Sequence, residues 1–79
     1  MSKFNERIKQ LRIDKKLTQK EMANILLITE RAYQYYEATR DPNVETLIRI
    51  ADCFDISTDY LLGRTDNPNS HKQHNKGDL

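Results

Sequence analysis

Two helix-capping residues, Thr18 and Thr29, stand only eleven positions apart in this chain and limit the lengths of the helices around them. Thr18 opens the sequence Thr-Gln-Lys-Glu, a capping box in which the threonine accepts a hydrogen bond from the Glu21 amide and the glutamate reaches back. Apolar residues follow each cap at helical spacing. We therefore predict short helices at about 18–26 and 29–37, joined by a turn so tight that the second helix crosses the first steeply.

The apolar pattern of the remaining chain predicts an all-α fold. One helical stripe precedes Thr18, and Asn43 and Ser57 are caps for two further helices. The residues expected to face inward on these three helices are Phe4, Ile8 and Leu11; Val44, Leu47, Ile48, Ala51 and Phe54; and Leu61 and Leu62. No run alternates apolar and polar residues as a half-buried strand does. We expect a compact domain of five helices over residues 1–65 and a polar, flexible tail over 66–79.

The chain is small and has a single cysteine. Its 79 residues are enough for one domain and leave little room for a long catalytic cleft. Cys53 has no partner for an internal disulfide, and we expect it half-buried at the edge of the fourth helix's apolar stripe. Secreted domains of this size usually carry several disulfides, and the sequence shows neither a signal peptide nor a membrane span. We therefore expect a cytoplasmic protein with no membrane association.

Charge is divided unevenly along the chain. The formal net charge is only +1, which by itself is low for a protein that binds nucleic acid. Residues 1–40 nevertheless hold nine Lys or Arg and five Asp or Glu, whereas residues 41–63 hold one Arg and five acids. A polyanion would thus be attracted to the first part and repelled by the second.

The predicted helix at 29–37 has two contrasting faces, because successive helical residues are rotated by about 100°. The side expected to face the core holds Ala32, Tyr33 and Tyr36. The opposite side holds Glu30, Arg31, Gln34 and Tyr35. Spacing alone leaves two interpretations open: a helical hairpin with a plain solvated face, or a helix-turn-helix motif whose outer face reads DNA.

Six stretches of the chain occur in a characteristic order. They are LTQKEMA at 17–23, Ile28 with Thr29, Tyr36 with Glu37, Pro42, TLIRIA at 46–51 and FDISTDYLLG at 54–63. Together they resemble the phage-repressor and Cro-type helix-turn-helix family, also called the xenobiotic-response-element family, over about residues 3–65. The resemblance implies a lambda-repressor-like fold with its motif at about 18–37. It also implies sequence-specific binding of double-stranded DNA by a transcriptional regulator, a repressor on a palindromic operator.

The resemblance assigns roles to the exposed residues of the motif. In this class the second helix, here about 29–37, enters the major groove with its N-terminal residues at base edges. The residues that we expect to contact bases are Glu30, Arg31, Gln34 and Tyr35. Arginine matches guanine O6 and N7, glutamine matches adenine N6 and N7, and glutamate accepts from cytosine N4. Phosphate contacts are expected from Gln19, Lys20, Thr29 and Arg40, since a helix N-terminus and basic side chains favour anions.

The resemblance also implies a structural ion pair between Arg12 and Glu37, which would join the first helix to the end of the third. Two positions depart from the family pattern, because Leu27 and Thr39 stand where family members often have glycine. A residue other than glycine in a left-handed conformation costs on the order of 1 kcal/mol. Either the two turns have a different shape here, or the core offsets the strain.

One recognition helix covers too few base pairs to select a genomic site, so we expect a homodimer on half-sites about 34 Å apart. The acidic part of the chain, 41–63, is the expected pairing surface. Within it, Ile50, Ile56 and Tyr60 are apolar residues that the core stripe only partly uses.

Other functions remain as alternatives or are excluded. The closely spaced tyrosines at 33–36 would also suit a protein-interaction module, or the antitoxin of a toxin–antitoxin pair, with a protein as partner. No catalytic set or cofactor motif is recognised, so we expect neither an enzyme nor a bound cofactor. His71 and His74 lack further ligands nearby, and we expect no metal site.

Overall fold

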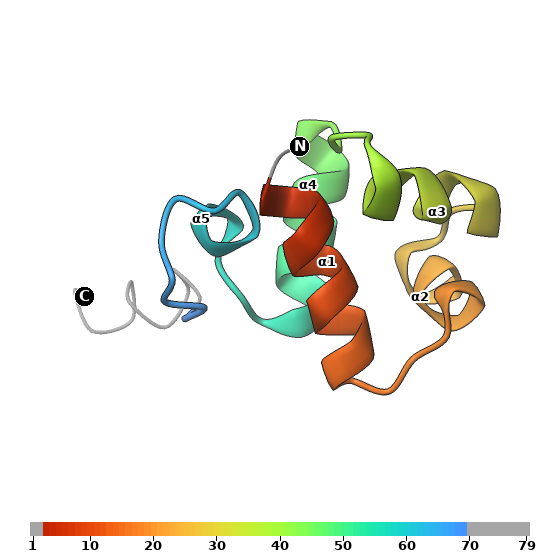
Figure 1. The fold of residues 1–79 in the computed structure, drawn as a ribbon, viewed down its shortest axis with the longest axis horizontal. Helices are drawn as coiled ribbons and strands as arrows, with labels where there is room; N and C mark the ends of the chain where they lie inside the picture. Colours follow the sequence, from red (N-terminus) through yellow and green to blue (C-terminus); the bar gives the residue numbers. More distant parts are fainter. Residues whose placement is uncertain (1–2, 70–79) are drawn as a thin grey trace.

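All five predicted helices are present in the computed structural model, which describes residues 3–69 of the chain (Figure 1). They are α1 (Lys3–Asp14), α2 (Gln19–Leu26), α3 (Glu30–Ala38), α4 (Val44–Phe54) and α5 (Thr58–Leu61). These described residues contain no strand, only an isolated antiparallel bridge between Ile56 and Asn69. The prediction of an all-α domain is confirmed.

Capping side chains set where the helices begin. Thr18 and Glu21 complete the predicted capping box, with hydrogen bonds of 3.0 and 2.8 Å. Thr29, Asn43 and Ser57 each accept a hydrogen bond from the amide three residues later, at 3.1, 2.8 and 2.9 Å. Each of these side chains satisfies a backbone N–H that has no partner within the helix.

A single apolar core lies between the helices. Its buried members are Phe4, Ile8, Met22, Ala23, Leu26, Tyr33, Tyr36, Ile50, Ala51 and Leu61. α1 packs against α3 and α5, α2 packs against α3 and α4, and α4 packs against α5. The pair α2 and α3 therefore forms one end of the molecule and α5 lies at the other (Figure 1).

The inward face of α4 is only partly the predicted one. As predicted, Ala51 is buried and Leu47 and Phe54 pack against the core. Val44 is 71% exposed and Ile48 is 47% exposed, whereas Thr46 and Ile50 are buried. Apolar residues are so frequent in this helix that two stripes, offset by part of a turn, fit its sequence. Only the stripe through Ile50 packs into the core. The prediction that Ile50 belongs to a pairing surface is therefore wrong, because its side chain is fully buried.

Two further exposures differ from the predictions. Cys53 is exposed rather than half-buried, since the rotation of α4 turns it outward. Leu62 is 42% exposed, because α5 ends at Leu61 and only Leu61 reaches the core.

The two positions that lack the family's glycine behave differently from each other. Leu27, in the turn after α2, has the left-handed conformation with φ 61°, and its side chain is 79% exposed. Leu27 thus carries the strain of about 1 kcal/mol that glycine would avoid. Thr39, after α3, has φ −143° and carries no such strain. The first turn is thus left-handed with leucine in place of glycine, and the second turn has a different shape.

The chain after α5 turns back onto the domain at Gly63. This glycine has φ 79°, and a Cβ at this position would lie 2.4 Å from the Lys3 Cβ. Because both the backbone conformation and the close approach exclude a side chain, glycine is required here.

Residues 66–69 are attached to the domain. The Ser57 amide donates to the Pro68 carbonyl at 3.1 Å, next to the bridge between Ile56 and Asn69. The first residues of the predicted tail, which was placed at 66–79, therefore contact the domain. Residues 70–79, with His71 and His74, lie outside the described part of the chain.

Candidate nucleic-acid interface

The outer face of α3 exposes the residues that were predicted to contact bases. They are Glu30, Arg31, Gln34 and Tyr35, the last of them 49% exposed. On the opposite side Tyr33 and Tyr36 are buried and Ala32 is half-buried. The predicted division of this helix into a core face and an outer face is confirmed. Since two of the three clustered tyrosines are core residues, the cluster does not form an exposed protein interface.

The residues predicted to contact phosphates flank this outer face. Lys20, in the first turn of α2, and Arg40, just after α3, are exposed. The Arg40 guanidinium lies 5.8 Å from the centre of the Tyr35 ring, a cation–π distance. The Thr29 oxygen accepts from the backbone to cap α3, which leaves its hydroxyl proton able to donate. Gln19, the first residue of α2, is half-buried.

Arg12 and Glu37 form the ion pair that the resemblance implies. Arg12 Nε donates to Glu37 Oε2 at 2.6 Å, and Nη2 donates to Oε1 at 3.3 Å. The two side chains are 15% and 6% exposed. Arg12 Nη1 also donates to the Leu17 carbonyl at 2.9 Å. The pair therefore ties α1 both to the end of α3 and to the segment that enters α2.

Glu37 accepts two further hydrogen bonds that the sequence did not predict. The Tyr33 hydroxyl donates to Oε2, and Gln19 Nε2 donates to Oε1 at 3.1 Å. Gln34 Nε2 in turn donates to Gln19 Oε1 at 3.3 Å. A polar network thus runs from the buried ion pair to the outer face of α3. The hydrogen bond from Tyr33 to Glu37 could have been predicted from the sequence, because a buried tyrosine hydroxyl needs a partner and Glu37 lies four residues later on the same helix.

This network favours the charged form of Glu37. Burial opposes its ionisation, but the hydrogen bonds from Arg12, Tyr33 and Gln19 outweigh burial and lower the pKa of the Glu37 carboxyl. The hydrogen bond to Glu37 raises the pKa of the Arg12 guanidinium, and burial followed by the same acceptor raises the pKa of the Tyr33 hydroxyl. Near neutral pH Glu37 is therefore an acceptor only, and each partner must present a donor.

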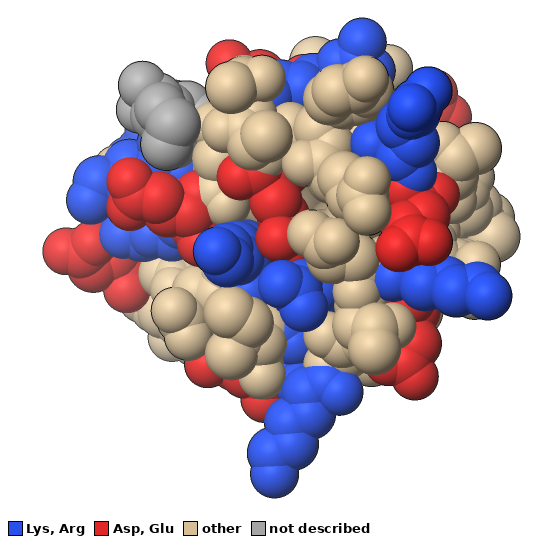
Figure 2. Space-filling model, turned by 45° about the vertical axis from the view of Figure 1, so that its right-hand side comes forward, with Lys and Arg blue, Asp and Glu red and all other residues tan. Residues whose placement is uncertain are grey.

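Positive charge around α2 and α3 is supplied by separate side chains. Figure 2 shows Lys and Arg groups that project individually among acidic and uncharged surface, rather than one continuous basic patch. Glu21 and Glu30 lie in the first turns of α2 and α3, where negative charge complements the helix dipole. The exposed cations near this end include Lys20, Arg31 and Arg40, with Lys15 and Lys16 in the turn before α2.

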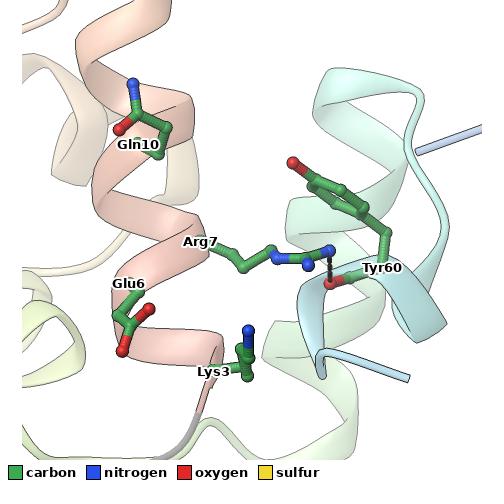
Figure 3. Close-up of a pocket in the computed structure, with 5 residues that line it drawn as sticks. All are labelled: Lys3, Glu6, Arg7, Gln10 and Tyr60. Atoms are coloured by element: carbon green, nitrogen blue, oxygen red, sulfur yellow. Dashed lines mark hydrogen bonds between the residues drawn. The ribbon is translucent and has the colours of Figure 1, made fainter. Parts of the chain in front are cut away.

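Arg7, on α1, uses its donors within the molecule (Figure 3). Nη1 donates to the Tyr60 carbonyl at 3.0 Å, the dashed line in Figure 3. Nη1 also donates to the Thr65 carbonyl at 2.8 Å, and Nη2 lies 2.7 Å from Asp66 Oδ1. The guanidinium also lies 4.1 Å from the centre of the Tyr60 ring. A neighbouring pocket of about 220 Å³ is lined by Lys3, Glu6, Arg7, Gln10 and Tyr60. Because Arg7 already serves these partners, the pocket holds no available guanidinium for a phosphate.

Two polar residues position the motif and were missed by sequence reasoning. Asn5 is buried on α1 and donates to the carbonyls of Tyr36 and Arg40, at 2.6 and 3.1 Å, so it holds the end of α3. Arg49 on α4 donates to the Leu26 carbonyl at 3.1 Å and so holds the end of α2. The contacts of both residues join positions more than twenty residues apart in the sequence, and no local sequence pattern predicts them.

Other kinds of site are not found within residues 3–69. No three His, Cys, Asp or Glu side chains in this range are grouped so that they could hold a metal ion. None of its helices has both the length and the apolar character needed to cross a membrane.

Two short helices that cross at a tight turn define a helix-turn-helix fold; here the first packs on α4, and the second packs on α1 and has a polar outer face. A family model described as helix-turn-helix matches residues 8–61, a range that includes α2, α3 and α4. The chain belongs to this helix-turn-helix family, of the xenobiotic-response-element type.

Named relatives share the matched region. The chain is 50% identical over 60 residues to the uncharacterized HTH-type transcriptional regulator YqaE of Bacillus subtilis, covering 75% of this chain and 52% of that protein. It is 39% identical over 62 residues to the HTH-type transcriptional regulator ImmR of the same species, covering 77% and 49%. It is 38% identical over 63 residues to the cryptic phage CTXphi transcriptional repressor RstR of Vibrio cholerae, covering 78% and 56%.

The chain thus spans about half the length of these relatives. No solved structure matches it significantly.

Proposed function

We propose that the chain binds double-stranded DNA sequence-specifically and regulates transcription, with α3 in the major groove. The observation that carries the proposal is the outer face of α3, whose polar and aromatic side chains stand clear of the core on the second helix of the motif. A helix so presented fits a groove about 12 Å wide. The relatives support regulation, since YqaE and ImmR are named as transcriptional regulators and RstR as a repressor. We infer that this regulation is repression.

In the proposed complex four residues of α3 contact the bases. Arg31 donates both arms of its guanidinium to guanine O6 and N7, and Gln34 pairs with adenine. Glu30 accepts from cytosine N4, and Tyr35 contacts a thymine methyl group. All four side chains are exposed, so none must leave a buried position to reach the groove.

The proposed phosphate contacts come from the edges of the motif. Lys20 and Arg40 contribute charge, and each phosphate that they neutralise adds about 0.9 to the slope of log affinity against log salt. Gln19 and Thr29 contribute neutral donors at the N-termini of α2 and α3, where the helix dipoles favour an anion. Together these contacts would fix the register of α3 on the duplex.

The proposed assembly is a homodimer on a palindromic operator, with α3 of each copy in its own half-site. We place the pairing surface on α4 and α5, because this part of the chain is acidic and DNA repels it. Ile56 and Tyr60 are half-buried and remain in this surface. Val44 and Ile48 take the place of Ile50, because they are the apolar residues of α4 that the core leaves exposed. The proposal implies a cytoplasmic protein without catalytic activity.

Selection of bound sequences from a random pool of duplex DNA tests the proposal. We expect the full chain to enrich a short inverted repeat whose half-sites lie about one helical turn apart. Affinity for that repeat should fall steeply as salt rises. Enrichment of no sequence, together with binding that does not depend on salt, would instead indicate a protein partner for this fold.

A further inference from the structure

The helix α5 is too short to be stable by itself. It consists of Thr58–Leu61, and isolated helices shorter than about 12 residues are marginal in water. Leu61 is its one buried residue, so little of α5 is anchored in the core. Contacts from outside the helix must therefore hold it in place, and with it Tyr60, a residue of the proposed pairing surface.

The chain after α5 supplies such a contact at the start of the helix. Residues 64–69, which we call the clasp, return to the N-cap residue Ser57. In a capping box the third residue of the helix accepts a hydrogen bond from the cap amide, but here that residue is Tyr60 rather than glutamate or glutamine. The Pro68 carbonyl accepts from the Ser57 amide instead, at 3.1 Å. The clasp thus satisfies a donor that has no partner within the helix.

Arg7, on α1, connects the clasp to the other end of the same helix. Its guanidinium donates to the carbonyl of Tyr60, in the last turn of α5, at 3.0 Å (Figure 3). It also donates to the Thr65 carbonyl at 2.8 Å and to Asp66 Oδ1 at 2.7 Å, both in the clasp. The same group lies 4.1 Å from the centre of the Tyr60 ring. One side chain of α1 therefore holds the backbone and the ring of Tyr60 together with the clasp.

We infer that Arg7 is a positioning residue for pairing: through the clasp it keeps α5 folded against α1, and so presents Tyr60 and Ile56 to a second copy of the chain. The inference rests on the proposed homodimer and names residues outside its surface on which pairing depends. Arg7 and the clasp lie outside residues 8–61, the range that the family model matches, so the family match does not supply this role.

The proposed contacts with DNA should not depend on Arg7. The end of α3 is held by other residues of α1, since Asn5 donates to the Tyr36 carbonyl at 2.6 Å and Arg12 pairs with Glu37. α5 packs against α1 and α4. Loss of the clasp should therefore weaken pairing and spare the affinity of one copy for one half-site. That split separates positioning from a general loss of stability.

The clasp can be tested without DNA. Arg7→Met removes the guanidinium and keeps an unbranched side chain. The amides of Leu61 and Leu62 donate to carbonyls at the start of α5, and NMR can follow their hydrogen exchange. In Arg7→Met this exchange should accelerate at least about tenfold relative to that of the Tyr33 amide in α3, because hydrogen bonds to a charged group stabilise by about that factor or more. An unchanged ratio would overturn the clasp.

Arg64→Met is the matched control, because Arg64 belongs to the clasp but its side chain is 73% exposed and lies 3.7 Å from Asp59. This variant should keep the exchange ratio and the pairing of the parent. Arg7→Lys keeps the charge but loses the planar fork that reaches several acceptors, so it should resemble Arg7→Met. Parent behaviour in Arg7→Lys would show that charge alone suffices and would overturn the role of the clasp.

Pairing is measured by titration of the selected inverted repeat and of a single half-site. Arg7→Met should lower the cooperativity between half-sites at least about fivefold, the lower end of a typical coupling. Its half-site affinity should stay within about twofold of the parent, since the two surfaces are separate. Gly63→Ala should show the same split with α1 unchanged, because its Cβ would lie 2.4 Å from the Lys3 Cβ and displace the clasp.

The outcomes separate the inference from the function on which it rests. Cooperativity that survives in both variants while α5 exchanges faster would refute the positioning role and leave the homodimer standing. A parent protein that binds the inverted repeat as independent copies would refute the proposed homodimer and this role of Arg7 together. The exchange ratio depends on neither DNA nor pairing, so it decides separately whether the clasp exists.

Discussion

Replacement of Glu37 by alanine tests the ion-pair network most directly. The Glu37 side chain is 6% exposed and accepts hydrogen bonds from three residues, Arg12, Tyr33 and Gln19. Without it, Arg12 keeps its bond to the Leu17 carbonyl and its contact with the Tyr33 hydroxyl, and that buried hydroxyl has lost its acceptor. A charge and a hydroxyl are then left in a largely apolar setting, which is costly for both groups.

The expected loss is large for a domain of this size. Removal of one partner from a buried ion pair costs about 3–5 kcal/mol. A chain of this length has a total stability of roughly 4–12 kcal/mol, at about 0.05–0.15 kcal/mol per residue. Since each 1 kcal/mol shifts the melting temperature of such a domain by about 4–8 °C, Glu37→Ala should melt at least about 12 °C below the parent.

Thermal and urea unfolding followed by circular dichroism measure this loss. Glu45→Ala is the matched control, because Glu45 is 82% exposed and lies 3.7 Å from Arg49, so its removal should cost less than about 1 kcal/mol. A double variant, Arg12→Met with Glu37→Leu, should recover much of the stability, since it leaves no unpaired charge. Melting of Glu37→Ala within a degree or two of the parent would refute the buried network. A double variant as unstable as Glu37→Ala would show that packing, and not the stranded charge, accounts for the loss.

Four further predictions follow from the fold and the interface. The pKa of Glu37 is lowered from 4.5 in the folded state, so its contribution to stability is present above that value and is lost as the pH falls through the folded pKa. The free energy of unfolding, measured across the acid range, should therefore depend less steeply on pH for Glu37→Gln than for the parent. Equal slopes would contradict this coupling. Arg31→Ala should cost about 1–3 kcal/mol on the selected site and relax preference at one position of each half-site; an equal loss on all sequences, measured by fluorescence anisotropy, would make Arg31 a phosphate contact. Lys20→Ala should flatten the plot of log affinity against log salt by about 0.9 for each bound copy, and an unchanged slope would remove Lys20 from the interface. Ile48→Glu should abolish cooperative binding to the inverted repeat while half-site affinity stays the same, as followed by sedimentation and band-shift titration; a dimer that persists in this variant would move the pairing surface elsewhere.

The placement of the helices could be predicted because the signals for it are local. Thr18, Thr29, Asn43 and Ser57 each act on an amide three residues away, so a short stretch of sequence contains the whole interaction. The outer face of α3 was predictable for a similar reason, since rotation along one helix separates the buried Tyr33 from its exposed neighbours.

The rotation of α4 could not be predicted in the same way. Its sequence fits two apolar stripes, and only packing against α2 and α5 decides that Ile50 is buried and Val44 exposed. The hydrogen bond between Gln34 and Gln19 also depends on how two helices cross, because the side chains are fifteen positions apart in sequence. The resemblance implied the ion pair of Arg12 and Glu37, but nothing in the sequence pattern showed that Gln19 also donates a hydrogen bond to Glu37.

The attachment of residues 64–69 determines where the polypeptide leaves the domain. Arg7 holds Asp66, and Asn69 forms its bridge with Ile56, so this segment lies beside α5, at the end of the molecule opposite α2 and α3 (Figure 1). Anything joined to the chain after Asn69 therefore starts its path on the far side from α3. For protein engineering, a fluorescent reporter or a surface tether fused at this point would leave the outer face of α3 unobstructed.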